Sequence, residues 1–394
     1  MQNENTKKTV IGQAEYIWLD GAKPTQKLRS KARVVAVPER NSVKITDFPE
    51  WSYDGSSTYQ AVGNDSDLIL QPVSFVDDPL RGAGNFLVMC EVLKADGTPH
   101  ETNLRARLRD ILDAGAADQE PWFGFEQEYT LTKANSPLGF PADGGFPSPQ
   151  GPYYCSVGAD VAFGRPVVEA HTRACIDAGL MIYGINAEVL PGQWEFQIGY
   201  RGLDESADPL TVADHLWIAR WLLYRITEDF GVVPTFDAKP VKGDWNGSGK
   251  HTNFSTNAMR DQKNGISAIN KAINALSFKH QEHIAVYGDG LAERLTGLHE
   301  TASINEFKQG VADRGASIRI PQAVALKGYG YLEDRRPGAN ADPYAVAARI
   351  LETICLETVN DNETDNTREI SSPVLNNHLP WKNADNPQGN LIQQ

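Results

Sequence analysis

The chain has 394 residues, of which 41% are hydrophobic and 22% charged, which is enough for a buried core and for two or three domains. Acidic residues outnumber basic ones by 51 to 37, and the net charge of −14 argues against a nucleic-acid binder or an anionic-membrane binder. No apolar run approaches the ~18 residues of a membrane span, and residues 1–8 lack the apolar stretch of a signal peptide. The four cysteines are dispersed along the chain. We therefore expect a cytoplasmic protein with free thiols.

The first part of the chain has the pattern of a small sheet domain. Residues 10–95 are rich in β-branched and aromatic residues and are interrupted by turn signals. The runs that indicate strands are 14–19, 33–37, 68–70 and 85–92. The first of these ends at Asp20–Gly21, a hairpin signal. A polar stretch from Asp54 to Asp67 separates two of the strands, and a loop of that length in a compact domain is usually functional or disordered.

From Thr102 onward, the apolar positions recur with a helical period. We expect helices over 104–115, 167–178 and 209–231, the last with Asp208 as its N-cap and Pro209 at its first position. Strands are expected between them at 122–131, 184–199 and 251–256. This mixture predicts an α+β fold with a domain boundary near residues 96–102. Composition also predicts a surface loop at 132–153 and a poorly ordered tail from about residue 360.

Two glutamates stand two positions apart in the first expected strand of the second part. Because side chains alternate along a strand, Glu126 and Glu128 point to the same face. One such pair is more often structural than functional. It becomes informative only beside other chemistry-bearing residues.

A second pair of glutamates flanks an expected hairpin turn. Pro191 and Gly192 suit the two central positions of a type II turn. Closing the hairpin around them places Glu188 directly opposite Glu195, where like charges are destabilising. Two facing carboxylates need a cation, so the pattern favours a metal site over a solvated face, with a different strand register as the open alternative.

One histidine follows a glycine-rich segment. On a strand, His251, Asn253 and Ser255 share one face, although a lone histidine is more often a satisfied structural residue than a metal ligand. The glycines at 247 and 249 resemble a phosphate loop, but the Walker spacing fails, because position 244 is Asp244. Zincin and nucleophile-elbow motifs are likewise incomplete.

A basic cluster completes the set of chemistry-bearing residues. Three arginines fall within 26 residues and two more follow shortly after: Arg294, Arg314, Arg319, Arg335 and Arg336. Arginines in an acidic protein can simply pair with carboxylates, but the bidentate guanidinium group also suits phosphate and carboxylate ligands. Glutamate-bearing strands, one histidine and several arginines together indicate a divalent-cation site that handles ATP phosphates.

Six segments closely resemble the class II (eukaryote-type) glutamine synthetases in order and spacing, and with their connections they cover about residues 12–355: 51–58, 122–131, 186–199, 246–256, 294–321 and 331–344. The resemblance implies an α+β protein with an N-terminal β-grasp domain at 12–97 and a C-terminal catalytic domain, an antiparallel sheet with helices, at 102–358. A tail at 359–394, rich in Asn and Asp, lies beyond them. It also implies a decamer of two stacked five-membered rings, with each active site shared between neighbouring subunits.

The resemblance also implies ligands for two Mg²⁺ or Mn²⁺ ions at each site. Glu128, Glu188 and Glu195 correspond to the ligands of the ion nearer glutamate and ammonia. Glu126, His251 and Glu333 correspond to the ligands of the ion that orients the nucleotide phosphates. The residues that the resemblance places around ATP, including metal ligands beside the phosphates, are Trp122, Glu126, Glu195, Asn253, Ser255, Arg314, Arg319 and Tyr331.

The remaining implied residues handle glutamate and ammonium. Asn246 and Gly247 correspond to the backbone that holds the amino end of glutamate, and Arg294 to the residue on its α-carboxylate. Arg314 corresponds to an arginine on the transferring phosphate, and Arg335 to the one that binds the γ-carboxylate and its phosphorylated form. Two carboxylates complete the set: Asp54 corresponds to the base that takes a proton from ammonium across the subunit boundary, and Glu300 to the residue of a closing flap.

The implied reaction has two steps. ATP phosphorylates the γ-carboxylate of L-glutamate, and ammonia then displaces phosphate to give L-glutamine. Use of a larger amine would require an opened ammonium pocket, and the presence of both Asp54 and Glu300 argues against it. A non-catalytic oligomer of the same fold would be expected to lack at least one metal ligand, and all six are present.

Overall fold

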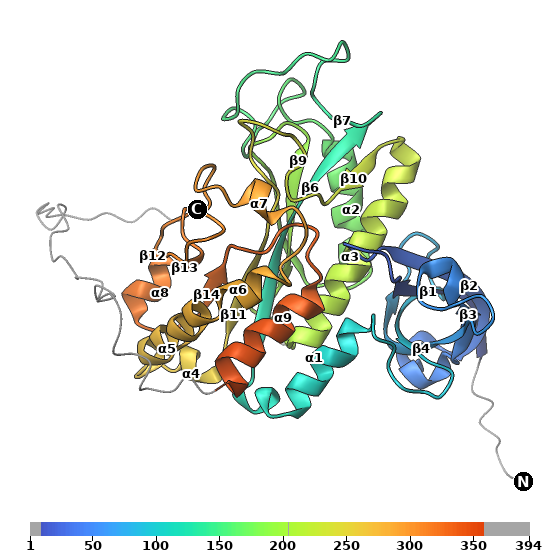
Figure 1. Cartoon of the computed structure of the whole chain (residues 1–394). Coiled ribbons are helices and arrows are strands. Elements are labelled where there is room, and N and C mark those ends of the chain that lie inside the picture. The colour runs from blue at the N-terminus through green and yellow to red at the C-terminus, as the bar shows by residue number, and fades with distance from the viewer. Residues whose placement is uncertain (1–8, 204, 358–394) are drawn as a thin grey trace, which may run out of the picture. The chain divides into compact units, whose positions relative to one another are not determined.

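A computed structural model describes residues 9–203 and 205–357, and the expected tail at 359–394 lies outside the described residues. The N-terminal domain is a sheet with strand order β2-β1-β5-β4-β3 (Figure 1). Its strands are β1 Thr9–Leu19, β2 Leu28–Pro38, β3 Trp51–Asp54, β4 Asp67–Asp77 and β5 Phe86–Leu93. Short 3₁₀ turns accompany them: η1 Arg40–Ser42, η2 Ile45–Asp47 and η3 Gly55–Thr58. The expected β-grasp strands are therefore confirmed.

The hairpin expected at Asp20 forms, but with a wider connection than a two-residue turn. The Asp20 amide donates to the Lys27 carbonyl across the loop (2.9 Å). The Asp20 side chain is fully buried, and its carboxylate accepts hydrogen bonds from the backbone amides of Ala22 and Lys27. It also pairs with Arg29. The buried carboxylate thus organises the longer loop that joins β1 to β2.

The second sheet is larger and mixes long and short strands. In the described residues it has nine strands, in the order β12-β13-β14-β11-β6-β9-β8, with β10 and β7 paired on β6. The strands are β6 Trp122–Lys133, β7 Ser136–Pro137, β8 Ile182–Ala187, β9 Gln193–Gly199, β10 Val233–Thr235, β11 Lys250–Ser255, β12 Gln309–Val311, β13 Ile318–Ile320 and β14 Leu332–Asp334. β6, the longest of them, lies between β9 and β11.

Helices pack around this sheet. They are α1 Leu104–Asp113, α2 Arg165–Asp177, α3 Pro209–Phe230, α4 Asn257–Arg260, α5 Gly265–Phe278, α6 His280–Ile284, α7 Leu291–Arg294, α8 Gln322–Lys327 and α9 Pro343–Leu351, with η4 Ala116–Gln119 and a π-helical turn η5 Glu352–Leu356. The expected caps of α3 are confirmed: the Asp208 carboxylate accepts from the Thr211 amide, and Gly231 ends the helix in the left-handed conformation. Along the described helices, none has both the length and the apolar character to cross a membrane.

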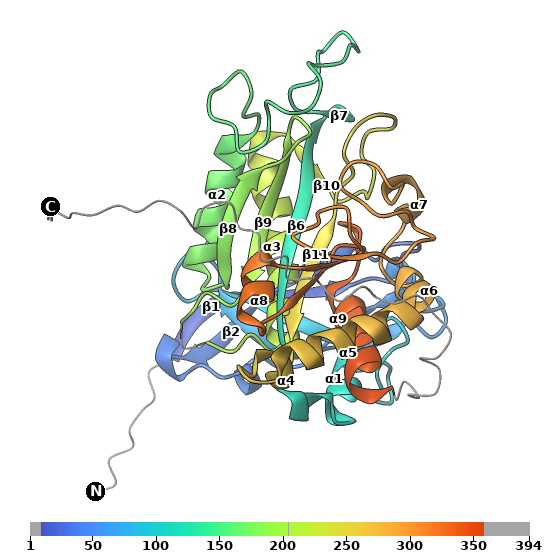
Figure 2. The ribbon, with the colours of Figure 1, turned by 90° about the vertical axis from the view of Figure 1, so that its left-hand side faces the viewer.

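The two faces of the large sheet differ in chemistry. Helices α2 and α3 cover one face, next to β8, β9 and β6 (Figure 2). Alternate residues of β6, such as Phe125 and Gln127, point to that side, where Arg220 of α3 donates a hydrogen bond to Gln127 Oε1 (2.9 Å). The intervening residues Glu126 and Glu128 therefore point to the opposite face. The glutamate pair belongs to the face that the two helices leave open.

The expected turn between β8 and β9 is confirmed, but the expected strand pairing is wrong. Gly192 has a φ of 76° and the Gln193 amide donates to the Leu190 carbonyl. However, residues 188–192 all belong to the connection, so Asn186, not Glu188, stands opposite Glu195. The wider connection forms because side chains satisfy its backbone: the Glu188 carboxylate accepts from the Val189 amide, and Gln193 Oε1 accepts from the Leu190 amide.

Candidate functional site

The open face of the large sheet gathers acidic side chains from neighbouring strands. In the antiparallel register, Glu128 of β6 lies opposite Glu195 of β9, and Glu126 lies opposite His251 of β11. Directly opposite residues in such a pair share a face. Two carboxylates do therefore oppose each other across a strand pair, as the sequence suggested, but the pair joins β6 to β9.

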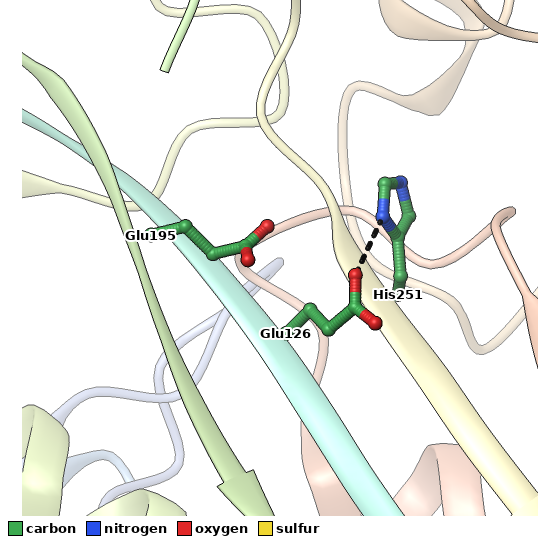
Figure 3. A group of neighbouring side chains, drawn as sticks. All are labelled: Glu126, Glu195 and His251. Atoms are coloured by element: carbon green, nitrogen blue, oxygen red, sulfur yellow. Dashed lines mark ion pairs between the residues drawn. The ribbon is translucent and has the colours of Figure 1, made fainter. Parts of the chain in front are cut away.

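Three of these side chains are close enough to share one ion. Ligand atoms of Glu126, Glu195 and His251 all lie within 4.8 Å of one another (Figure 3). His251 Nδ1 is 3.5 Å from Glu126 Oε2 and also 3.5 Å from an oxygen of Glu333. Asn253 Nδ2 donates to Glu126 Oε1 at 2.8 Å and fixes that carboxylate. The structure thus places Glu195 beside Glu126 and His251. The resemblance assigns those two residues, together with Glu333, to the ion that orients the nucleotide phosphates.

Glu128 and Glu188 extend the acidic cluster. Glu128 is buried and accepts hydrogen bonds from Gln193 Nε2 (3.1 Å) and from the Gly249 amide (2.8 Å). Burial raises the pKa of Glu128 to about 7, while burial and repulsion from Glu128 raise the pKa of Glu188 to about 8. Burial and the surrounding carboxylates also raise the pKa of Glu195 well above its usual range. Such crowding of acids is relieved by a cation.

The donor set fits a hard divalent cation. Carboxylate oxygens with one imidazole nitrogen suit Mg²⁺ or Mn²⁺, whereas the softer metals favour thiolate ligands. Burial, together with nearby arginines such as Arg335, lowers the pKa of His251 well below its usual range, so the ring is neutral. A neutral imidazole has a lone pair available for a metal. His251 therefore meets the protonation requirement of a metal ligand, and a bound cation would favour the ionised form of the crowded acids.

Arginines surround the acidic cluster. Arg294 is buried and its Nη2 lies 3.3 Å from His251 Nε2, while burial lowers the pKa of this guanidinium to about 10. Arg335 Nη1 donates to Glu333 at 2.7 Å, and Arg319 pairs with the same carboxylate. Glu333 is fully buried. Its charge is therefore balanced by two guanidinium groups in the described structure.

A pocket of about 540 Å³ opens over this cluster. Among the residues expected at the site, those that line it are Glu126, Glu128, Glu188, Glu195, Asn246, Gly247, His251, Arg294, Glu300, Arg314, Arg319 and Arg335. These residues come from segments far apart in the sequence. Most of the expected metal, phosphate and glutamate ligands therefore face one cavity.

Four further expected residues line a neighbouring aromatic pocket of about 320 Å³: Trp122, Asn253, Ser255 and Tyr331. The ring of Trp122 lies 4.7 Å from that of Tyr200, and the Arg260 guanidinium lies over the Trp122 ring at 4.1 Å. Asn253 connects the pockets, because its amide holds Glu126 of the acidic pocket. Exposed aromatic rings beside a cation suit a planar base, with its phosphates directed toward the acids.

Several pocket residues were not found by sequence reasoning. Tyr183, Tyr200 and Arg260 line the aromatic pocket, and their sequence neighbourhoods carry no distinctive signal. Tyr154 lines the acidic pocket from just beyond the proline- and glycine-rich stretch interpreted as a surface loop. Gln197 was recoverable: it is two residues from Glu195 on β9, and its Nε2 donates to that carboxylate (2.5 Å). The two-residue period of a strand would have placed it on the same face.

Asp54 does not line either pocket of its own chain. It lies at the end of β3, exposed, and accepts hydrogen bonds from the hydroxyl groups of Ser56 and Ser57 (2.6 Å each) and from the Ser56 amide (3.0 Å). These hydrogen bonds lower the pKa of Asp54 to about 2. Asp54 is thus ionised at neutral pH and is held in place by its own loop.

Comparison with protein families and known proteins agrees with this geometry. The family model for the glutamine synthetase β-grasp domain matches residues 11–95, and the model for the glutamine synthetase catalytic domain matches residues 101–363. The chain is 56% identical over 351 residues to the chloroplastic glutamine synthetase of Chlamydomonas reinhardtii, covering 86% of this chain and 90% of that protein.

Other relatives and one solved structure extend the comparison. Identity is 55% to the glutamine synthetase of Streptomyces viridochromogenes, covering 87% of this chain and 96% of that protein, and 52% to that of Mus musculus, covering 89% and 91%. A cryo-EM structure of Plasmodium falciparum glutamine synthetase shares the fold, with a TM-score of 0.68 at 16% identity, over 87% of this chain and 71% of that one. The acidic cluster, the adjoining aromatic pocket and these matches together show that the chain belongs to the glutamine synthetase family and is an ATP-dependent glutamate–ammonia ligase that uses divalent metal.

Proposed function

We propose that the acidic and aromatic pockets bind the three substrates side by side. ATP enters the aromatic pocket, with its base against Trp122 and Tyr331. Glutamate lies in the acidic pocket, with its α-carboxylate on Arg294 and its amino end at the backbone of Asn246 and Gly247. The observation that carries this proposal is the convergence of Glu126, Glu195 and His251 directly beside the aromatic pocket.

The first step is transfer of the γ-phosphoryl group to the γ-carboxylate of glutamate. Arg335 orients that carboxylate, and Arg314 and Arg319 neutralise charge on the phosphates. Bound Mg²⁺ or Mn²⁺, held by two trios of ligands (Glu126, His251 and Glu333; Glu128, Glu188 and Glu195), would supply further neutralisation of the phosphate oxygens. Since Glu333 is already paired with Arg319 and Arg335, it sets the positions of both guanidinium groups.

The second step needs neutral ammonia, although ammonium is the form that an acidic pocket attracts. A carboxylate must therefore accept a proton close to the acyl phosphate. We assign that role to Asp54, whose low pKa keeps it ionised so that it attracts ammonium. Glu188, which lines the acidic pocket, provides a second carboxylate for the ammonium ion. Glu300 closes over the intermediate and excludes water.

The exposed position of Asp54 supports an oligomer in which the β-grasp domain of one subunit completes the site of its neighbour. Its own chain leaves Asp54 outside both pockets. We propose a decamer of two five-membered rings in the cytoplasm. Sizing of the purified protein tests the assembly, and a pentamer would refute ring stacking.

Activity of the full chain tests the assigned chemistry. We expect ATP-dependent formation of γ-glutamyl hydroxamate from glutamate and hydroxylamine, and glutamine from ammonium, only with Mg²⁺ or Mn²⁺ present. Methylamine in place of ammonium should give less than about a tenth of the rate, because the acidic pocket is built for a small cation. Equal rates with both amines would refute the assigned ammonium pocket and favour a γ-glutamyl-amine ligase.

A further inference from the structure

A turn on the rim of the acidic pocket has an unusual backbone. We call residues 297–302 the flap. Its base is closed by an isolated β-bridge between Thr296 and Ser303, and its tip carries Leu298, which is 66% exposed. His299 and Glu300 both have positive φ, at 53° and 59°. Two consecutive non-glycine residues in the left-handed region are strained, so other contacts must hold them there.

The inner side of the flap is held by the site itself. Arg335 Nη2 donates to the Glu300 carbonyl at 3.4 Å. The Thr301 hydroxyl donates to the carbonyl of Leu298 at 2.8 Å and to that of Arg294 at 3.3 Å. These contacts fix the carboxyl-terminal side of the flap. They do not fix the His299 side chain.

The outer side of the flap is held by a contact between two side chains. His299 Nε2 lies 3.1 Å from Asp244 Oδ1, and His299 lines both the acidic pocket and a separate cavity of about 490 Å³ on the outer side. The Asp244 side chain is 97% exposed, whereas the imidazole is 18% exposed. An almost fully exposed carboxylate is thus directed onto one side chain of the strained turn.

Asp244 belongs to a well-anchored loop that also contributes to the glutamate site. The next residue, Trp245, is buried and stacks on Phe146, with ring centroids 6.3 Å apart. The Asn246 amide donates to Gln150 Oε1 at 2.6 Å. The Asp244–His299 contact therefore ties the flap to the loop that carries Asn246 and Gly247.

We propose that Asp244 and His299 form a latch that positions Glu300 over the reacting carbonyl, which makes them positioning residues for the ligase reaction. This inference rests on the proposed role of the acidic pocket. A contact between polar side chains with one partner fully exposed contributes little free energy, so the latch shifts the balance between closed and open flap by about two- to fivefold. A weak contact suits a lid that must open in every turnover.

Loss of the Asp244–His299 contact should increase the hydrolysis of ATP that is not coupled to glutamine formation. If water replaces ammonia, it attacks the acyl carbon of γ-glutamyl phosphate, the bond from that carbon to the phosphate oxygen breaks, and glutamate and phosphate are released with one proton. The net reaction is hydrolysis of ATP without glutamine. Phosphate released per glutamine formed is therefore the sensitive quantity, and a purely structural contact would not change it.

The experiment compares Asp244→Ala, His299→Gln and the double variant as full-length assembled protein at saturating ATP, glutamate, ammonium and Mg²⁺. The measured quantity is the phosphate released in excess of one per glutamine, and we expect this excess to be about two to five times as large in each single variant as in the unsubstituted protein. The control is Lys242→Gln, which breaks the ion pair with Glu293 in the same outer cavity without touching the flap, and it should leave the excess as it is in the unsubstituted protein.

The double variant tests whether Asp244 and His299 act through one shared contact. A double variant with the same ratio as the single variants supports a latch, because both substitutions remove one contact. An excess of phosphate in both single variants equal to that of the unsubstituted protein, or effects that add in the double variant, would overturn it. Because the Asp244 side chain is almost fully exposed, its replacement should not disturb folding, so a changed ratio in Asp244→Ala is not explained by misfolding. Absence of glutamine formation in the unsubstituted protein would instead refute the proposed function, so the two failures are distinguishable.

Discussion

Replacement of Glu128 by glutamine should make the metal-free protein more stable while abolishing its activity. Glu128 is 8% exposed, faces Glu195 across the β6–β9 pair and has a pKa raised to about 7. Glutamine keeps the shape of the side chain and an oxygen for the Gly249 amide, but it removes the buried charge. The substitution therefore isolates the electrostatic strain of the acidic cluster when metal is removed by a chelator.

The size of the effect follows from proton linkage. A carboxyl group with a pKa of about 7 in the folded state and 4.5 in the unfolded state binds more protons when folded, so stability falls as pH rises from 4.5 to 7. A shift of that size corresponds to ~3 kcal/mol above pH 7. The gain in unfolding free energy from Glu128→Gln should thus approach about 3 kcal/mol at pH 8 and vanish near pH 4.5.

Denaturant unfolding with a chelator at pH 5 and pH 8, at fixed protein concentration, measures this gain. Glu306→Gln is a matched control, because Glu306 is exposed and lies outside both pockets. Addition of Mg²⁺ should then stabilise the unsubstituted protein more than the variant. The reasoning is refuted if Glu128→Gln is no more stable than the unsubstituted protein at pH 8 without metal, or if the gain is equal at both pH values.

Three other predictions concern the aromatic pocket, the core and the assembly. Trp122→Ala should raise the KM for ATP about tenfold through loss of stacking, with Trp122→Phe within about threefold and the KM for glutamate unchanged in steady-state kinetics. His171 is buried and its pKa is lowered to about 4, so the unfolded state binds a proton at this residue before the folded state does as the pH falls below 6.5. Replacement by leucine (His171→Leu) should therefore reduce the loss of stability between pH 7 and pH 4.5 by about 2 kcal/mol, measured by thermal and denaturant unfolding. If sites are shared between subunits, inactive Asp54→Asn and Arg335→Ala proteins, unfolded and reassembled together, should recover about a quarter of the activity, and no recovery would place each site within one chain.

The sheet-borne part of the site was predictable because strands have a simple period. Glu126 and Glu128 share a face in any strand, and His251 with Asn253 follows the same rule. What the period cannot supply is which strands are neighbours. The like-charged pair was therefore assigned across the wrong pair of strands, since the connection at 188–192 is wider than a two-residue hairpin.

The loop-borne part was less accessible to sequence reasoning. Tyr154, Tyr183 and Arg260 line the pockets from segments without a distinctive pattern, and their placement depends on long-range contacts. Arg260, for example, is oriented by Ser255 and by the Glu120 carbonyl, which lies 140 residues away in the chain. Loops carry much of the function in rigid folds, but their geometry is set by the elements that they cross.

The two halves of the site also differ in how they hold charge, and this difference suits the order of the reaction. Glu333 is buried between Arg319 and Arg335, so its negative charge is balanced before any substrate binds. Glu128, Glu188 and Glu195 lie close to one another, and burial together with the neighbouring carboxylates raises their pKa values, a shift that a cation would relieve. On the proposed assignment of the substrates, the phosphate side is therefore preorganised by the protein, whereas the ammonium side is completed by metal. Because Glu128 and Glu195 lie on the central strands β6 and β9, the sheet can bear their repulsion without rearrangement, whereas the proposed flap is a turn on the rim of the pocket and is free to move.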